Sequence, residues 1–151
     1  APASVFETVT LASLVEEETA VAAERPLVAS VYRNRLRIAM ALQCDPTVIY
    51  ALQLAGRYRG ALSRDDLAVQ NPYNTYLRPG LPPGPISNPG RASLQAALAP
   101  SDTGYLYFVA DQKGGHVFSA DLDRHARAVA GYRRNNNRAK KPAGRVRRPV
   151  R

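Results

Sequence analysis

Cysteine and histidine are both scarce in this sequence. Cys44 is the single cysteine, so no disulfide can form within the chain. His116 and His125 are the only histidines, and no His-Glu-x-x-His motif occurs, which disfavours a metal hydrolase. Apolar runs long enough to cross a bilayer are missing, and no signal peptide is recognisable. We therefore expect a soluble chain without a metal site or an internal disulfide.

The positive charge of the sequence is concentrated at its carboxyl end. The formal net charge is +9 over 151 residues. Residues 133–151 hold nine basic side chains and no acidic one, whereas residues 1–132 carry equal numbers of both signs. We expect one globular domain over 1–132 and a basic, disordered tail over 133–151. The tail is most simply solvated. Any partner of it would be anionic, but the neutral body offers no patch that would support nucleic-acid binding.

One glutamate occupies an apolar position on the first predicted helix, over residues 7–22. At 100° per residue, Glu18 falls on the same face as Leu11, Leu14 and Val15, whereas the other two glutamates of the run 16–18 fall outside it. A carboxyl group among aliphatic side chains is harder to ionise, so its pKa rises and it can serve as a general acid. The alternative is a structural carboxylate that an arginine or backbone N–H groups satisfy.

The remaining pattern predicts a mainly helical α+β domain. On a second helix, over 26–39, Asn34 shares the inward phase of Glu18. We expect these two helices to pack together, with both polar groups opening on a cleft walled by the Pro/Gly-rich loop 70–91. The other predicted elements are a helix over 45–54 with Asp45 as its N-cap, a short turn from Ser63, a helix over 92–98, a β-hairpin of 105–109 with 116–118, and a closing helix over 121–134.

Six segments occur in an order that identifies a family resemblance. They are 11–19 (LASLVEEET), 34–36 (NRL), 42–50 (LQCDPTVIY), 73–76 (YNTY), 80–90 (GLPPGPISNPG) and 105–111 (YLYFVAD). Together they closely resemble the MltG or YceG-like family of endolytic murein transglycosylases over about residues 8–132. The resemblance implies a lysozyme-like catalytic fold that cleaves the β-1,4 bond between N-acetylmuramic acid and N-acetylglucosamine inside peptidoglycan strands and leaves 1,6-anhydromuramoyl ends.

The resemblance also assigns roles to residues. The catalytic glutamate of the family is the second acidic residue of an E-x-E-T motif, which is Glu18 here, the residue that helical phase selects independently. One residue would act first as acid and then as base, without a cofactor and without a second inward carboxylate. Asp45 is the nearest rival and is better explained as an N-cap. The expected substrate-binding residues are Asn34, Gln43, Tyr73, Asn74, Tyr76, Asn88 and His116. Loop Asn and Tyr residues often secure their own turns instead, and His116 could equally be structural at a strand edge.

The sequence departs from the family pattern at three points. Cys44 replaces a threonine after Gln43, and Glu17 stands where lysine is frequent. The amino-terminal membrane helix and LysM-like module of the family are absent, so a membrane anchor is expected only in a full-length protein. The resemblance places such a protein in the bacterial cell envelope, at the periplasmic or extracytoplasmic face of the inner membrane, with glycan strands as substrate and peptidoglycan synthases as further partners.

Two rival functions follow from the same residues. The label aminodeoxychorismate lyase, sometimes attached to this family, would require a lysine for a pyridoxal-phosphate Schiff base. The only lysines are Lys113 in a predicted turn and Lys140 and Lys141 in the tail, so this reading is poor. A non-catalytic peptidoglycan-binding module is the second rival, and the intact Glu18 is the argument against it.

Overall fold

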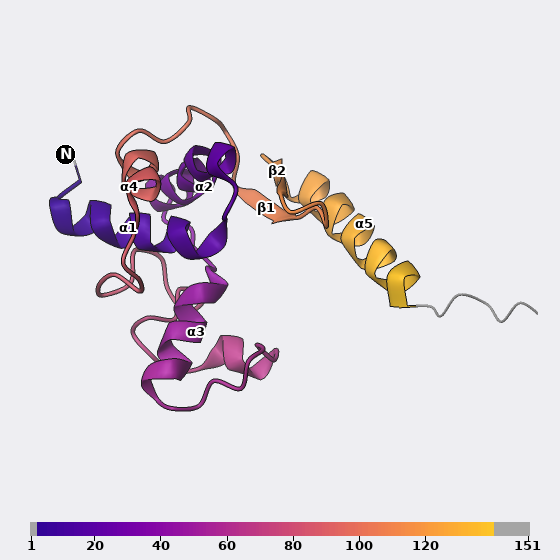
Figure 1. Cartoon of the computed structure of the whole chain (residues 1–151), viewed down its shortest axis with the longest axis horizontal. Coiled ribbons are helices and arrows are strands. Elements are labelled where there is room, and N and C mark those ends of the chain that lie inside the picture. The colour runs from indigo at the N-terminus through magenta and orange to yellow at the C-terminus, as the bar shows by residue number, and fades with distance from the viewer. Residues whose placement is uncertain (1–2, 141–151) are drawn as a thin grey trace, which may run out of the picture.

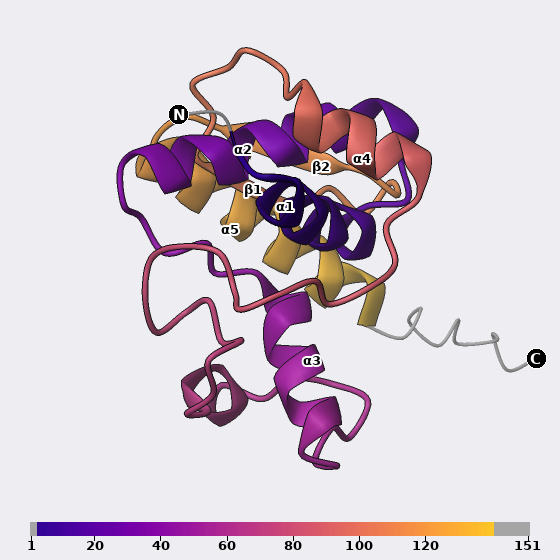
Figure 2. The same ribbon diagram turned by 90° about the vertical axis from the view of Figure 1, so that its left-hand side faces the viewer.

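The computed structural model describes residues 3–140 and has the mainly helical α+β architecture that the sequence predicts. In chain order the elements are α1 (Val5–Glu18), the 3₁₀ turn η1 (Ala22–Glu24), α2 (Arg25–Arg37), α3 (Asp45–Leu54), η2 (Asp65–Ala68), α4 (Arg91–Leu98), β1 (Tyr107–Ala110), β2 (His116–Ser119) and α5 (Leu122–Lys140). Figures 1 and 2 show α1, α2 and α4 grouped together with α3 below them, and in Figure 1 the hairpin of β1 and β2 lies with α5 to the right of this group.

Helix α1 begins with a capping box and ends at the glutamate that the sequence singles out. The Ser4 hydroxyl accepts from the N–H of Glu7, and the Glu7 carboxylate accepts from the N–H of Ser4. The expected end at residue 22 is wrong, because Thr19 is extended (φ −145°, ψ 139°) and its hydroxyl accepts from the N–H of Val21 at 3.0 Å. Glu18 is therefore the last helical residue, next to a change in chain direction.

The core lies where α1, α2 and α4 meet. Apolar side chains at helical spacing on α1 and α2 are fully buried, among them Leu14, Val15, Val28 and Tyr32. Burying side chains of this size stabilises the fold by roughly 1.5–3 kcal/mol each. Helix α4 has Gly90 at its N-cap, which offers no capping side chain. Instead, Glu16 of α1 accepts from the N–H of Gly90 (2.7 Å) and from the hydroxyl of Ser93 (3.1 Å), so the first glutamate of the run 16–18 is structural.

The Pro/Gly-rich segment 70–90 contains neither helix nor strand. Ser13 of α1 fixes part of it, since its hydroxyl accepts from the N–H of Ile86 (3.0 Å) and its carbonyl accepts from the hydroxyl of Ser87 (3.0 Å). The segment thus lies against the glutamate-bearing helix.

The hairpin and α5 close the described part of the chain. Strands β1 and β2 are antiparallel, with Tyr107 opposite Ser119 and Ala110 opposite His116, so β1 begins two residues later than predicted. Helix α5 packs against both strands and continues to Lys140. The part of the predicted disordered tail over 133–140 is therefore helical, because Tyr132 and Asn136 carry the inner face of α5 onward, where the Tyr132 carbonyl and the Asn136 side chain each accept from Nε2 of Gln112. Residues 141–151 lie outside the described residues. None of the helices within 3–140 is both long and apolar enough to span a bilayer.

Candidate active site

Glu18 lies at the end of α1 beside a pocket of about 340 Å³. Its Oε1 accepts a 2.8 Å hydrogen bond from Oη of Tyr32, a fully buried residue of α2. The side chain remains partly exposed where it lines the pocket, although protein atoms surround most of the carboxylate. Its inward direction agrees with the one that helical phase predicts.

Burial controls the protonation of Glu18. Loss of water around the charged form raises the pKa of Glu18 above its usual value. The Tyr32 hydroxyl and the Cys44 thiol oppose this effect because they stabilise the carboxylate, whereas the negative charge of Asp45 adds to it. The net rise in pKa leaves more of Glu18 protonated near neutral pH than an exposed glutamate would be, as a general acid requires.

A second carboxylate reaches the same pocket. The expectation that Asp45 is the N-cap of α3 is wrong, because the helix begins at Asp45 itself and Cys44 precedes it as the cap. The carboxylate of Asp45 instead accepts a hydrogen bond from Oη of Tyr76. The expectation that Glu18 has no carboxylate neighbour in the pocket is therefore wrong. Among residues 3–140, no three His, Cys, Asp or Glu side chains gather as a metal ion would require.

The pocket brings together two further residues that the sequence predicts. Gln43 and Tyr76 line it with Glu18. Gln43 has a positive φ of 50°, which is uncommon for a residue other than glycine, and its N–H donates to the carbonyl of Thr75 at 3.2 Å. The N–H of Cys44 donates to the Thr75 hydroxyl at 2.9 Å, so the segments that carry Gln43 and Tyr76 are held side by side.

Asn34 and Asn74 lie away from this pocket. The Asn34 amide donates to the carbonyls of Thr103 (2.8 Å) and Tyr105 (2.9 Å), which ties α2 to the chain leading into β1. The Asn74 amide is fully buried and donates to the carbonyls of Leu67 and Val69, both at 2.9 Å. The expected cleft that Asn34 shares with Glu18 is not formed, because the Asn34 amide binds backbone carbonyls instead of facing that pocket. The Asn74 amide likewise binds backbone carbonyls.

Three more predicted residues are outside the pocket lining. The ring of Tyr73 packs on Tyr50 with centroids 4.8 Å apart, and Asn88 is exposed. His116 is anchored by Glu24, which accepts from the His116 N–H at 2.8 Å and lies 2.7 Å from its Nδ1. This geometry corresponds to the structural alternative for His116 at the strand edge.

The sequence reasoning missed Tyr32, which contacts Glu18, and the pocket-lining side chains from α2, β1 and α5. Tyr32 and Arg35 follow Val28 at spacings of four and seven residues, so they continue its buried face and could have been found by helical phase. Tyr107 and His125 come from β1 and α5, and only the tertiary fold brings them to the pocket.

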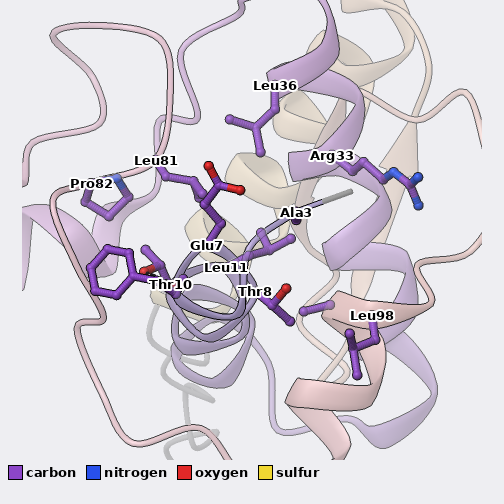
Figure 3. A pocket seen from close by; sticks show the side chains of 12 residues that line it. Ala3, Glu7, Thr8, Thr10, Leu11, Arg33, Leu36, Leu81, Pro82 and Leu98 are labelled. Atoms are coloured by element: carbon purple, nitrogen blue, oxygen red, sulfur yellow. Dashed lines mark hydrogen bonds between the residues drawn. The ribbon is translucent and has the colours of Figure 1, made fainter. Parts of the chain in front are cut away.

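A larger groove of about 820 Å³ lies at the other end of α1 (Figure 3). Leu11, Leu36, Leu81 and Leu98 give it an apolar lining, and Glu7 lines it too, with its carboxylate between Leu81 and Leu36 in Figure 3. Glu7 belongs to the capping box and lies about 16 Å along the helix from Glu18 at 1.5 Å per residue. Because Glu7 is exposed and its carboxylate is engaged in that capping box, the groove lacks a buried acid among its lining residues, and the smaller pocket is the candidate active site.

Comparisons with known proteins agree on one family. The model of the YceG-like family matches residues 1–131. Relatives named endolytic murein transglycosylase include one from Bacillus subtilis, 46% identical over 134 residues, and one from Streptococcus pneumoniae, 37% identical over 131 residues. These matches cover 89% and 84% of this chain but only 36% and 24% of the relatives. The crystal structure of a yceG-like protein from Listeria monocytogenes is similar at a TM-score of 0.74 and 45% identity, over 82% of this chain and 39% of that one.

Proposed function

The chain belongs to the YceG-like family, and on that premise we propose that it is the catalytic part of an endolytic murein transglycosylase. It cleaves the β-1,4 bond between N-acetylmuramic acid and N-acetylglucosamine within glycan strands. The products are strands with 1,6-anhydromuramoyl ends. Because the chain spans about a third or less of these relatives, this activity is proposed for it and not taken over from them.

One observation carries the proposal: Glu18 lies in a pocket, with its pKa raised by burial and one carboxylate oxygen fixed by Tyr32. A protonated carboxylic acid can donate to the oxygen of a glycosidic bond. The hydrogen bond from Tyr32 engages Oε1, and we assign Oε2 as the oxygen that carries the proton toward the substrate.

The reaction then needs two proton transfers by the same residue. Glu18 donates its proton to the bridging oxygen as the bond to C1 of the muramoyl residue breaks, and the N-acetylglucosamine leaves with a new hydroxyl. The muramoyl N-acetyl group stabilises the positive charge at C1. The C6 hydroxyl of that residue then attacks C1, and the Glu18 carboxylate takes up the hydroxyl proton. Glu18 is thereby protonated again, and no water is consumed.

Neighbouring residues position the acid and the sugar. Tyr32 holds the rotamer of Glu18, and Gln43 and Tyr76 present an amide and a phenol at the same pocket. Asp45 pairs with Tyr76, which keeps its carboxylate engaged while Glu18 works. Its closeness to Glu18 also favours the protonated acid, because two neighbouring carboxylates resist ionising together.

We also propose a domain boundary and a cellular location. Residues 1–132 form the catalytic domain, in agreement with a family match that ends at residue 131. The names of the murein relatives support a location in the cell envelope. Within it we propose the periplasmic or extracytoplasmic face of the inner membrane for the full-length protein, with peptidoglycan synthases as partners.

Digestion of purified, uncrosslinked glycan strands tests the proposal. The chain should shorten long strands at internal bonds, seen by size separation and mass spectrometry, and Glu18→Gln should not. Glu17→Gln is the matched control, since that side chain is exposed one position away. A chain that binds strands without ever shortening them would be the non-catalytic peptidoglycan-binding module instead.

A further inference from the structure

Arg35 is a buried cation with no acidic partner among residues 3–140. Its side chain is about 6% exposed, and the two ion pairs in this range join other residues. Backbone carbonyls occupy part of the guanidinium: Nε donates to Leu106 at 2.7 Å, and Nη1 donates to Ala41 and Leu42 at 2.9 and 3.2 Å. These neutral acceptors leave the positive charge uncompensated, which is costly in a buried position.

The free side of this guanidinium belongs to the pocket that holds Glu18. Arg35 lines that pocket, and its Nη2 makes no hydrogen bond within the described residues. Burial lowers the pKa of Arg35, although guanidinium stays charged at any ordinary pH. An anion at Nη2 would offset the cost of burying the charge.

His125 supplies a second unpartnered polar atom on the same wall. Its Nδ1 is buried without a hydrogen-bond partner, although the ring lines the pocket. The imidazole is stacked on Tyr107 with centroids 4.9 Å apart and planes at 22°, and the Arg35 guanidinium lies 5.2 Å from the centre of the Tyr107 ring. Burial and then the charge of Arg35 lower the pKa of His125, so the ring is neutral near pH 7 and can donate one hydrogen bond or accept one.

We propose that Arg35, Tyr107 and His125 form a subsite that binds a carboxylate attached to the muramoyl residue through its lactyl group. The proposal rests on the proposed function, because it takes peptidoglycan as the substrate. The carboxylate can come from two sources. In strands without stem peptides it is the lactyl carboxylate itself, and in strands with stem peptides it is a carboxylate of the peptide. Arg35 would donate from Nη2, and a rotation of the His125 ring would bring its buried Nδ1 to the same group or to an adjacent amide.

The position of the subsite has a consequence for the reaction. Glu18 and Asp45 line the same pocket as Arg35, Tyr107 and His125. A carboxylate held there would bind the muramoyl residue in one orientation. Its charge would also disfavour ionisation of Glu18, so binding would help to keep the acid protonated.

Binding of matched ligands to the Glu18→Gln chain tests the subsite without cleavage. One pair consists of glucosaminyl-muramoyl tetrasaccharides with free lactyl carboxylates or with lactyl carboxamides. The second pair carries stem peptides with free carboxylates or with carboxamides. By calorimetry, we expect one carboxylate ligand to bind about 10- to 100-fold more tightly than its carboxamide, as charge-assisted hydrogen bonds would provide. The pair that shows the difference identifies the source of the carboxylate.

Variants in the same background locate the effect. His125→Phe keeps a ring on Tyr107 but removes the ring nitrogens, and Arg35→Gln removes the charge; both should reduce the preference for carboxylate. Arg33→Gln is the matched control, because Arg33 is exposed on the same helix and lies outside this pocket, so the preference should not change. Should Arg35→Gln fail to fold, His125→Phe still tests the proposed subsite.

Two outcomes would contradict the proposal in different ways. Equal affinity within both pairs would overturn the carboxylate subsite and leave the proposed function standing. No binding of any of the four glycans would overturn the proposal that this chain acts on peptidoglycan, and the subsite with it.

Discussion

Removing the Tyr32 hydroxyl should move the pH dependence of cleavage toward higher pH. This hydroxyl donates to Glu18 at 2.8 Å and stabilises the ionised carboxylate, so it lowers the pKa of Glu18 against the larger effect of burial. Tyr32→Phe keeps the buried ring and removes the hydroxyl that makes this bond. The pKa of Glu18 should then rise further.

The general energies of hydrogen bonds set the expected size of the shift. A hydrogen bond to a charged group contributes about 1.5–3 kcal/mol, and one to a neutral group about 0.5–1.5 kcal/mol. The difference of about 1–1.5 kcal/mol is what the hydroxyl gives to the charged form over the protonated one. At about 1.36 kcal/mol per pH unit, the pKa of Glu18 should rise by roughly one unit.

The assay is kcat/KM for glycan cleavage as a function of pH. An acid acts in its protonated form, so kcat/KM falls as pH rises through the pKa of Glu18, and in Tyr32→Phe this fall should come about one pH unit later. Tyr105→Phe is the matched control, because that ring packs on Phe118 away from the carboxylate. A fall at unchanged or lower pH in Tyr32→Phe would refute the assignment of Glu18 as the acid.

Other substitutions test the same carboxylate and its neighbours. Glu18→Gln should reduce cleavage by about 10²–10⁴-fold, measured by released muropeptides, and Glu17→Gln should leave it unchanged. The pKa of Glu18 is raised in the folded state above its ordinary 4.5, so the contribution of protonated Glu18 to wild-type stability is lost as pH rises through the folded pKa. Glu18→Gln should therefore match the melting temperature of wild type below pH 4.5 and exceed it above the folded pKa. A melting-temperature difference that is independent of pH would contradict this. Glu16→Ala should lower the free energy of unfolding by about 1–2 kcal/mol in urea, because α4 loses the acceptor for Gly90 and Ser93; an unchanged midpoint would speak against that cap.

Helical phase was sufficient to predict the inward direction of Glu18. The pattern of Leu11, Leu14 and Val15 directs Glu18 inward, and the capped helix of the structure has that phase. The pattern could not show that Thr19 ends the helix, since the hydrogen bond from Val21 to its side chain forms only with the local turn. The class of the fold followed from periodicity because the helices are amphipathic and the hairpin is local.

Residues in loops were much harder to assign. An inward or loop asparagine can bind a sugar or a backbone carbonyl, and the sequence does not reveal which carbonyls lack partners. Asn34 and Asn74 bind backbone carbonyls 69 to 71 and 5 to 7 residues away, respectively. The wall of Arg35, Tyr107 and His125 depends on three elements that meet only in the tertiary structure, so no single-element pattern predicts it.

Cleavage of glycan strands in water enriched in heavy oxygen tests the single-acid mechanism most directly. If Glu18 serves both proton transfers, the C6 hydroxyl closes on C1 and the new muramoyl ends are 1,6-anhydro sugars without solvent oxygen, lighter than reducing ends by one water. The alternative is hydrolysis, for which Asp45 offers a structural basis because it lines the same pocket and a carboxylate there could activate water. Reducing muramoyl ends that carry the heavy oxygen would contradict the account and show a hydrolase that uses two carboxylates.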